Sequence, residues 1–200
     1  YIVPLRDDAT FQNGDPVTAE DVIHTILAPV EEETENASEV DMVDSAEAID
    51  ETTVQFDLAY PYGAFEVTLV RNVVNESVRT DDREAYNTDP VTSGPYQLVD
   101  WEPESSATVE RWDNYWDDAN GLPNVATIEF EPIEEQTTRV TELETGNVDV
   151  IETIPPQLYE TVENNENATI DETPGVGYFY LAFNCGDGPT ADPLVREAVD

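Results

Sequence analysis

The chain has 200 residues, which suits one large domain or two small ones, and 39% of them are hydrophobic, so a real apolar core is expected. Its 46 Asp and Glu residues stand against only 7 basic residues, all of them Arg, which gives a formal net charge of −39. This composition argues against wholesale disorder, and it argues against a nucleic-acid partner because the phosphates would be repelled.

The excess of carboxylates predicts adaptation to molar salt. A globular chain with this charge repels itself in dilute buffer, whereas at about 1 M salt the screening length falls to roughly 3 Å. The acidic residues are spread along segments with apolar periodicity and do not form a separate tail. We therefore expect a halophilic protein with an acidic surface.

The sequence contains no run of 18 apolar residues that would predict a membrane span, and it does not open with a signal peptide. Tyr1 already lies in the strand-like run "YIVPL", and the last residues, "DPLVREAVD", resemble a helix cut part-way. We therefore expect an excised piece of a longer chain. Cys185 is its only cysteine, so no disulfide can form within this piece.

The first elements in chain order are a strand over residues 1–5 and a helix that begins after Thr18. Thr18 can cap the helix, because Asp21 stands three residues further on, in the position of a capping box. Pro29 and the acidic run at 31–33 should end it. Helical spacing predicts one apolar stripe on this helix, formed by Val22, Ile23, Ile26, Leu27 and Val30.

A β-hairpin is expected next, from the segments 40–49 and 52–58, of which the second alternates polar and apolar residues. The motif "YPYGAF" opens a short helical segment that runs to about Arg71. Residues 81–89 are polar and are expected to form a loop.

The second half alternates strands and helices. One helix should end at Gly146, in the position of a C-cap, a second should open at Pro155 and Pro156, and a third should begin near Pro193. Strands are expected at 92–101, 107–112, 125–133, 148–151, 168–173 and 176–184. Together these elements predict a mixed α/β (α+β) sheet protein and not a bundle or a barrel.

Enzyme motifs are missing from the sequence. His24 is the only histidine, and without a Cys or His pair a structural zinc site is not expected. Neither the nucleophile elbow G-x-S-x-G nor a phosphate-binding loop ending in G-K-[ST] occurs. Paired carboxylates carry no specificity among 46 acidic residues. We therefore expect no catalytic residue, no metal and no cofactor.

Features that could bind a small molecule are better defined. Arg71 follows the aromatic residues Tyr60 and Tyr62, and in so acidic a chain it could hold a ligand carboxylate or form a surface ion pair. Tyr178 and Tyr180 share one face of the expected strand at 176–184. These two rings could stack on a ligand or pack in the core.

Seven segments, taken in order, resemble the extracellular solute-binding proteins of peptide and nickel ABC importers (family 5). They are "LRDDATFQNGDPVTAEDVIHTI", "IDETTVQFDLAYPYGAF", "VTSGPYQLVDW", "VERWDNYW", "LETGNVDVI", "YFYLAFN" and "DPLVREAVD". The resemblance implies the class II periplasmic-binding-protein-like fold, whose two lobes close over a ligand at a hinge. It places residues 1–90 in the small subdomain of lobe I, 91–178 in its main sheet, and 179–200 in the hinge strand and the start of lobe II.

The same resemblance implies roles for single residues. Tyr180 is similar in position to a tyrosine that contacts the ligand in peptide-binding members, whereas Ala182 stands where one kind of member has an acid. Thr153 matches a position near the peptide backbone, and Arg71 matches an arginine that holds a ligand carboxylate in the nickel-binding branch. The expected ligand-binding residues are Arg71, Thr153, Tyr178, Tyr180 and Asn184.

The function implied by the resemblance is capture of di- or oligopeptides outside the cell, by a membrane-anchored lipoprotein that delivers them to an ABC permease. Two lobes would close over the peptide, and no bond would be made or broken. Three alternatives stay open. One is a nickel chelate, a sugar or another solute of the same family, the second is a salt-adapted hydrolase, and the third is a sensory surface protein that presents its ligand to a receptor.

The charge yields a first testable prediction. The protein should lose cooperative structure when the salt concentration falls from molar to about 0.1 M, because the repulsion among carboxylates is then no longer screened. Circular dichroism over a salt series measures this loss. Full stability in dilute buffer would contradict the expected adaptation to salt.

Overall fold

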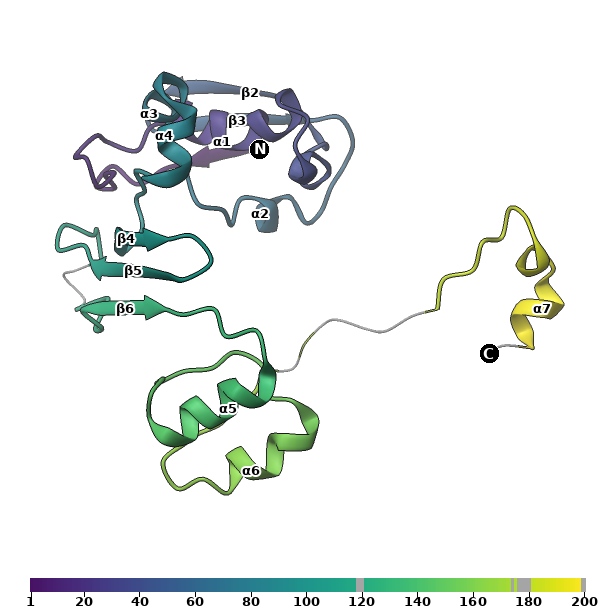
Figure 1. Cartoon of the computed structure of the whole chain (residues 1–200). Coiled ribbons are helices and arrows are strands. Elements are labelled where there is room, and N and C mark those ends of the chain that lie inside the picture. Colours follow the sequence, from purple (N-terminus) through teal and green to yellow (C-terminus); the bar gives the residue numbers. More distant parts are fainter. Residues whose placement is uncertain (118–120, 174, 176–180, 199–200) are drawn as a thin grey trace. The chain divides into compact units, whose positions relative to one another are not determined.

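The computed structural model describes residues 1–117, 121–173, 175 and 181–198 (Figure 1). The chain divides into two compact units, Tyr1–Pro132 and Ile133–Asp200, and each is described by itself. The mixed α/β class expected from the sequence is confirmed. The subdomain boundaries expected at residues 90 and 178 stay a prediction.

The first sheet of unit 1 is antiparallel and has the strand order β1-β3-β2. Its strands are β1 (Ile2–Pro4), β2 (Val43–Asp50) and β3 (Thr53–Leu58). The polar–apolar alternation of β3 turns Val54 and Phe56 inward, where both are 0% exposed. The predicted N-terminal strand and β-hairpin are therefore confirmed.

Helix α1 (Ala19–Glu31) starts at the predicted capping box. The backbone N–H of Thr18 donates to Asp21 Oδ2 over 2.8 Å, and the N–H of Asp21 donates to Thr18 Oγ1 over 3.4 Å. The helix passes through Pro29 and ends at Glu31. The proline does not stop the helix, because in the last turn it removes only one backbone hydrogen bond.

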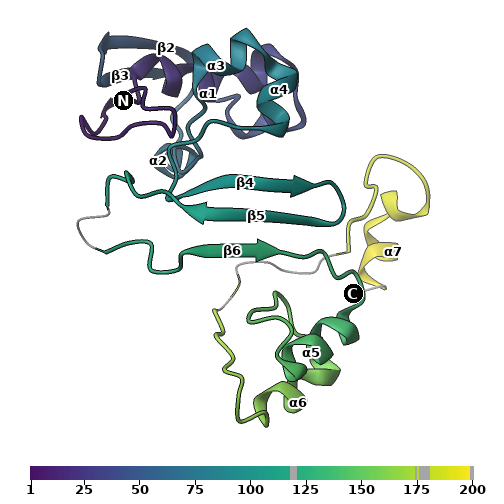
Figure 2. The ribbon, with the colours of Figure 1, turned by 60° about the vertical axis from the view of Figure 1, so that its left-hand side comes forward.

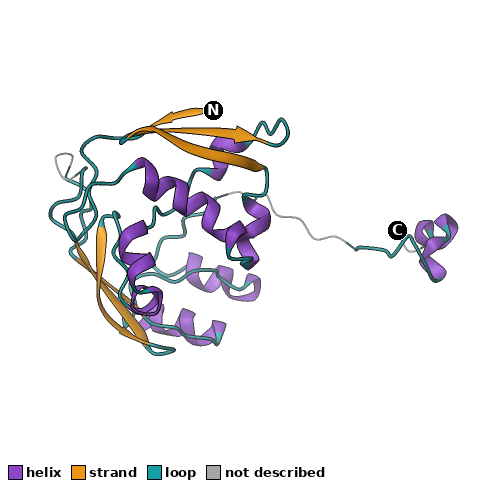
Figure 3. Ribbon diagram, turned by 90° about the horizontal axis from the view of Figure 1, so that it is seen from above, coloured by secondary structure: helices purple, strands orange, loops and turns teal. Residues whose placement is uncertain are grey.

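The main core of unit 1 lies between α1 and the first sheet. Figure 3 shows the helices in purple and the strands in orange. Phe65 packs edge-on against Phe56, with ring centroids 5.3 Å apart. Val30 was predicted on the apolar stripe, but it is 43% exposed and Ala28 is buried instead, in the turn that contains Pro29. The buried cluster comprises Ala19, Val22, Ile26, Val40, Met42, Val54, Phe56 and Phe65.

Three short helices follow the first sheet, and only the first of them was predicted. Helix α2 (Phe65–Thr68) is shorter than the segment expected to reach Arg71. The loop expected at 81–89 is wrong for most of its length, since α3 (Glu76–Asp81) is followed at once by α4 (Arg83–Thr88). A side-chain cap begins α3 and α4. The Asn75 side chain accepts the backbone N–H of Val78, and the Asp82 side chain accepts that of Ala85. A short 3-10 helix, η1 (Glu35–Glu39), connects α1 to β2.

The second sheet of unit 1 has the order β4-β5-β6, with β5 in the centre (Figure 2). Its strands are β4 (Tyr96–Glu102), β5 (Ser106–Arg111) and β6 (Thr127–Phe130), which confirms the strands predicted here. Trp101, Ala107 and Phe130 pair in one row across the three strands, so they share one face. Trp101 is 44% and Phe130 is 54% exposed.

Unit 2 is helical in its described part. Helix α5 (Gln136–Thr145) ends at Gly146, whose φ of 75° gives the left-handed C-cap predicted from the sequence. The other predicted helices are also present, as η3 (Pro156–Leu158) with α6 (Tyr159–Glu163), and as α7 (Pro193–Glu197) after η4 (Pro189–Ala191).

The strands predicted in unit 2 are wrong where the structure describes them. Residues 148–151, 168–173 and 181–184 are not in strands, and residues 176–180 lie outside the described part. A strand requires a neighbour for its backbone hydrogen bonds, and the described residues of unit 2 offer none.

Asp21 connects two helices of unit 1, α1 and α3. Its side chain caps α1 through Oδ2, and its Oδ1 accepts the backbone N–H of Glu76, the first residue of α3, over 2.9 Å. The residue is 7% exposed. Because one buried carboxylate accepts N–H groups at the starts of both helices, Asp21 fixes α3 against the start of α1.

We expect Asp21→Ala to lower the free energy of unfolding by about 1 to 3 kcal/mol, since two backbone donors lose their acceptor. Denaturant unfolding at fixed high salt measures the change. Glu20→Ala is the matched control, because Glu20 is an exposed acid in the same helical turn, and it should stay within about 0.5 kcal/mol of the wild type. Equal effects of the two substitutions would contradict the assigned role.

Candidate functional site

The five residues expected to bind ligand fall into different parts of the chain. Arg71 belongs to unit 1, whereas Thr153 and Asn184 belong to unit 2. Tyr178 and Tyr180 lie outside the described residues. The structure therefore describes the surroundings of three candidates, each within its own unit.

Arg71 is the candidate with the most defined geometry. It follows α2, and its Nε donates to the carbonyl oxygen of Thr68 over 2.8 Å. Its Nη2 forms an ion pair with Glu39 Oε2 over 3.0 Å. The side chain of Arg71 is 21% exposed and that of Glu39 is 57% exposed, so the guanidinium is partly sheltered while its partner is in solvent.

An aromatic hollow of about 520 Å³ lies between the end of β3 and the residues that follow it. The rings of Tyr60 and Tyr62 are nearly perpendicular, with centroids 6.4 Å apart. The Tyr60 hydroxyl donates to Asp41 Oδ1 over 3.3 Å, and desolvation together with this carboxylate raises the pKa of Tyr60. Such rings can stack on a flat group, but Arg71 is not among the residues that line the hollow.

Thr153 has an unusual backbone. Its φ is 65°, in the left-handed region that a β-branched side chain rarely adopts, and the residue is exposed. This conformation costs about 1 to 3 kcal/mol, and residues of this kind concentrate at ligand sites and switches. The backbone of Thr153 thus sets it apart from the other threonines of the described chain.

Asn184 has a local structural role. Its Oδ1 accepts the backbone N–H of Gly186 over 3.0 Å, and its carbonyl oxygen accepts Thr190 Oγ1 over 2.8 Å. The side chain is exposed and closes a turn of its own segment. Its NH₂ group is therefore the part of Asn184 that remains to contact a ligand.

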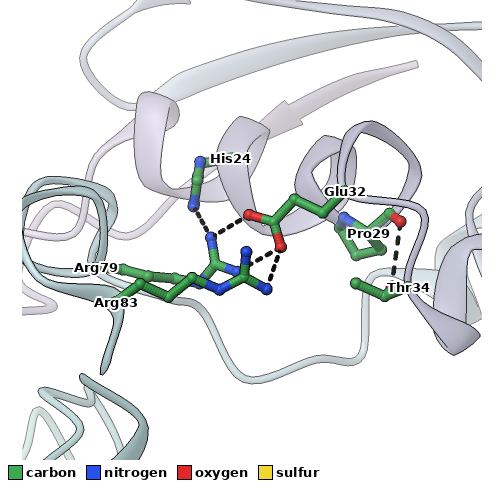
Figure 4. Close-up of polar contacts among 6 residues, drawn as sticks. All are labelled: His24, Pro29, Glu32, Thr34, Arg79 and Arg83. Atoms are coloured by element: carbon green, nitrogen blue, oxygen red, sulfur yellow. Dashed lines mark hydrogen bonds and ion pairs between the residues drawn. The ribbon is translucent and has the colours of Figure 1, made fainter. Parts of the chain in front are cut away.

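The densest charged cluster of the described residues lies around Glu32, at the C-terminal end of α1 (Figure 4). Arg79 binds both carboxylate oxygens of Glu32, over 2.8 and 2.7 Å, and Arg83 reaches Oε2 over 2.7 Å. His24 Nε2 lies 3.0 Å from Arg79 Nη1, so this ring nitrogen is the acceptor. The cluster ties α1 to α3 and α4.

Sequence reasoning missed the Glu32 cluster. Its partners are 47 residues apart in the chain, and no short motif relates them. The Glu32 carboxylate is already paired with both arginines. Hydrogen bonds from Arg79 are the first cause of a lowered pKa of Glu32, and the hydrogen bond to Glu32 is the first cause of a raised pKa of Arg79. We therefore interpret the cluster as a structural joint.

The described residues contain neither a metal site nor a membrane-spanning helix. No group of three or more His, Cys, Asp or Glu side chains is arranged there to hold a metal ion. Among the same residues, no helix has both the length and the apolar character needed to cross a bilayer.

Comparison with known proteins gives a match over the whole chain. The model of the bacterial extracellular solute-binding proteins, family 5 Middle, matches residues 1–200. The glutathione-binding protein GsiB of Escherichia coli (strain K12) is 27% identical over 210 residues, which cover 100% of this chain and 40% of that protein. The chain thus spans less than half of this relative.

Solved structures show the same fold. The unliganded open form of the periplasmic murein tripeptide-binding protein MppA matches with a TM-score of 0.79 and 22% identity, over 96% of this chain and 41% of that one. NikZ from Campylobacter jejuni, in complex with Ni(L-His), matches with a TM-score of 0.72 and 22% identity, over 83% and 34%. At this identity the structures support the fold alone.

The Glu32 cluster yields a prediction about pH. Because Arg79 lowers the folded-state pKa of Glu32 from its ordinary 4.5, the pair stabilises the protein above that value, and the stabilisation is lost as the pH falls through the lowered pKa. We expect Glu32→Gln to cost about 1 kcal/mol at pH 7 and to weaken the pH dependence below 4.5. Chemical unfolding across pH measures both effects.

Glu31→Gln is the matched control, since it removes the same charge from an exposed neighbour on α1. It should leave the stability at pH 7 within about 0.5 kcal/mol of the wild type. Identical pH profiles for the two variants would show that the Glu32 cluster contributes nothing specific.

Proposed function

Because the chain belongs to family 5 of the bacterial extracellular solute-binding proteins, we propose that it is part of the substrate-binding component of an ABC importer that captures di- or oligopeptides. The family match over residues 1–200 carries the proposal. The relatives named for glutathione and murein tripeptide favour peptides, since both ligands are short peptides with free carboxylates.

Capture by this protein needs no chemical step. A ligand that contacts both lobes binds the closed state better than the open one, and it shifts the hinge equilibrium by the difference between these affinities. Contacts to the peptide backbone give affinity for many sequences, and water fills the side-chain pockets. The absent catalytic motifs are consistent with a binding protein.

The proposed ligand contacts differ in their chemistry. Arg71 would hold a carboxylate through a charge-assisted hydrogen bond, and the exposed, left-handed Thr153 would lie beside the ligand backbone. Asn184 would donate from its NH₂ group, and Tyr178 and Tyr180 would stack on the ligand or donate from their hydroxyls.

The setting of the protein follows from the family and the composition. Family members are extracellular, and we propose that this protein is held at the membrane as a lipoprotein and passes its ligand to a permease. The net charge of −39, from 46 acidic and 7 basic residues, supports a halophilic source and an acidic surface.

A metal chelate is the second candidate ligand. The structural neighbour NikZ was solved in complex with Ni(L-His), and in this chain Arg71 would bind the carboxylate of a small chelator. No group of three or more His, Cys, Asp or Glu among the described residues is arranged to hold the metal.

Mass spectrometry of the small molecules released on denaturation tests the proposal, with the intact protein purified in high salt. We expect a ladder of short peptides, which would make Thr153→Ala and Tyr180→Phe the first variants to test for loss of affinity. A metal chelate or a sugar would instead contradict peptide capture and put Arg71→Ala first.

Calorimetric titration with the released ligand then compares each variant with Arg111→Ala. Arg111 is a suitable control, since it also pairs with an acid, Asp113, but lies on β5 of the second sheet. Loss of affinity in Arg111→Ala equal to that in the site variants would contradict the assigned contacts.

A further inference from the structure

The ion pair of Arg71 differs from the cluster around Glu32 in the exposure of its acidic partner. Glu39 is 57% exposed, whereas Glu32 is 24% exposed and is shared by two arginines. A pair whose carboxylate lies in solvent contributes little, because water and salt compete for both charges. Glu39 can therefore leave Arg71 at small cost.

Arg71 keeps its orientation without Glu39. Its Nε donates to the carbonyl oxygen of Thr68 over 2.8 Å, and its backbone N–H donates to Leu69 over 2.9 Å. Its Nη1 makes no hydrogen bond to any residue that the structure describes. The guanidinium thus remains fixed by its own segment while its Nη groups are free to exchange one carboxylate for another.

The position of Glu39 is fixed by the backbone and not by its side chain. Glu39 ends η1, and the next residue, Val40, is 0% exposed and donates its N–H to the carbonyl oxygen of Ala37 over 3.2 Å. Met42 is 3% exposed. These buried neighbours anchor the segment, so the Glu39 carboxylate can swing between Arg71 and solvent without disturbing the fold.

We propose that Glu39 is a specificity-determining residue, which occupies Arg71 in the ligand-free protein and must be displaced by the carboxylate of an incoming ligand. This inference rests on the proposed role of Arg71 in ligand binding. Glu39 lowers the affinity for every ligand that uses Arg71, and it leaves ligands without a carboxylate unaffected. The protein thereby binds weak anions less tightly, because they must compete with an internal carboxylate held nearby.

Side-chain NMR of the intact protein tests the competition directly, with acetate as the probe at constant ionic strength. The Nε–H signal of Arg71, assigned through its loss in Arg71→Lys, reports on the exchange. In Glu39→Gln, the acetate concentration at which this signal has changed by half (the midpoint) should be about two- to fivefold lower than in the wild type. This is the range expected for an exposed ion pair. Glu35→Gln is the control in η1, and its midpoint should equal that of the wild type.

An unchanged or raised midpoint in Glu39→Gln would overturn the inference, as would an equal fall in Glu35→Gln. A second titration, with trialanine and its C-terminal amide, separates this inference from the proposed function. Tighter binding of trialanine but not of the amide to Glu39→Gln supports both. Binding of neither peptide counts against peptide capture, and the acetate midpoints then decide on Glu39 alone.

Discussion

The structure depends on which groups its seven arginines bind, because the chain has 46 acidic side chains. All seven lie in the described part, and each is engaged. Five form ion pairs with acids, and two donate to backbone carbonyls; these are Arg6, Arg71, Arg79, Arg83 and Arg111 in the first group, and Arg139 and Arg196 in the second. Within these 200 residues, an arginine that binds a ligand would therefore have to exchange or share an existing contact.

Several carboxylates take donors from the backbone instead of from an arginine. Hydrogen bonding to the N–H of Thr52 is the first cause of a lowered pKa of Asp50, and Glu135, which caps α5, has its pKa lowered first by Thr137. Acidic residues thus close turns and begin helices as well as repelling one another. Several side chains accept a backbone N–H in this way, namely Asp21, Asp50, Asp82, Glu135 and Asp192.

This use of carboxylates explains which parts of the fold the sequence predicts. The capping box of Thr18 and the C-cap of Gly146 are local, so the sequence alone specifies them. Helix α4 was missed because an acidic, polar segment resembles a loop until Asp82 is recognised as its cap. The strands expected in unit 2 depend on partners outside their own segment, and periodicity cannot supply those.

The candidate site is predictable in part for the same reason. The sequence identifies Arg71 as a rare cation near aromatic residues, but its pairing with Glu39, 32 residues away, follows only from the fold. The left-handed backbone of Thr153 has no sequence signal, since threonine does not favour it. The resemblance to solute-binding proteins supplies only the proposed role of Thr153, and the structure adds the conformation.

Because the chain has few cations, the solvent exposure of each ion pair decides how strongly salt weakens it. At about 1 M salt the screening length of roughly 3 Å is comparable to the 3.0 Å between Arg71 Nη2 and Glu39 Oε2, so an exposed pair of this kind is weakened by the solvent itself. The partly buried pair of Arg79 and Glu32, with both side chains less than a quarter exposed, is screened much less. High salt therefore weakens exposed pairs, such as that of Arg71 and Glu39, more than the partly buried pair that holds α1 to α3. This difference is the physical basis of the proposal that a ligand carboxylate replaces Glu39.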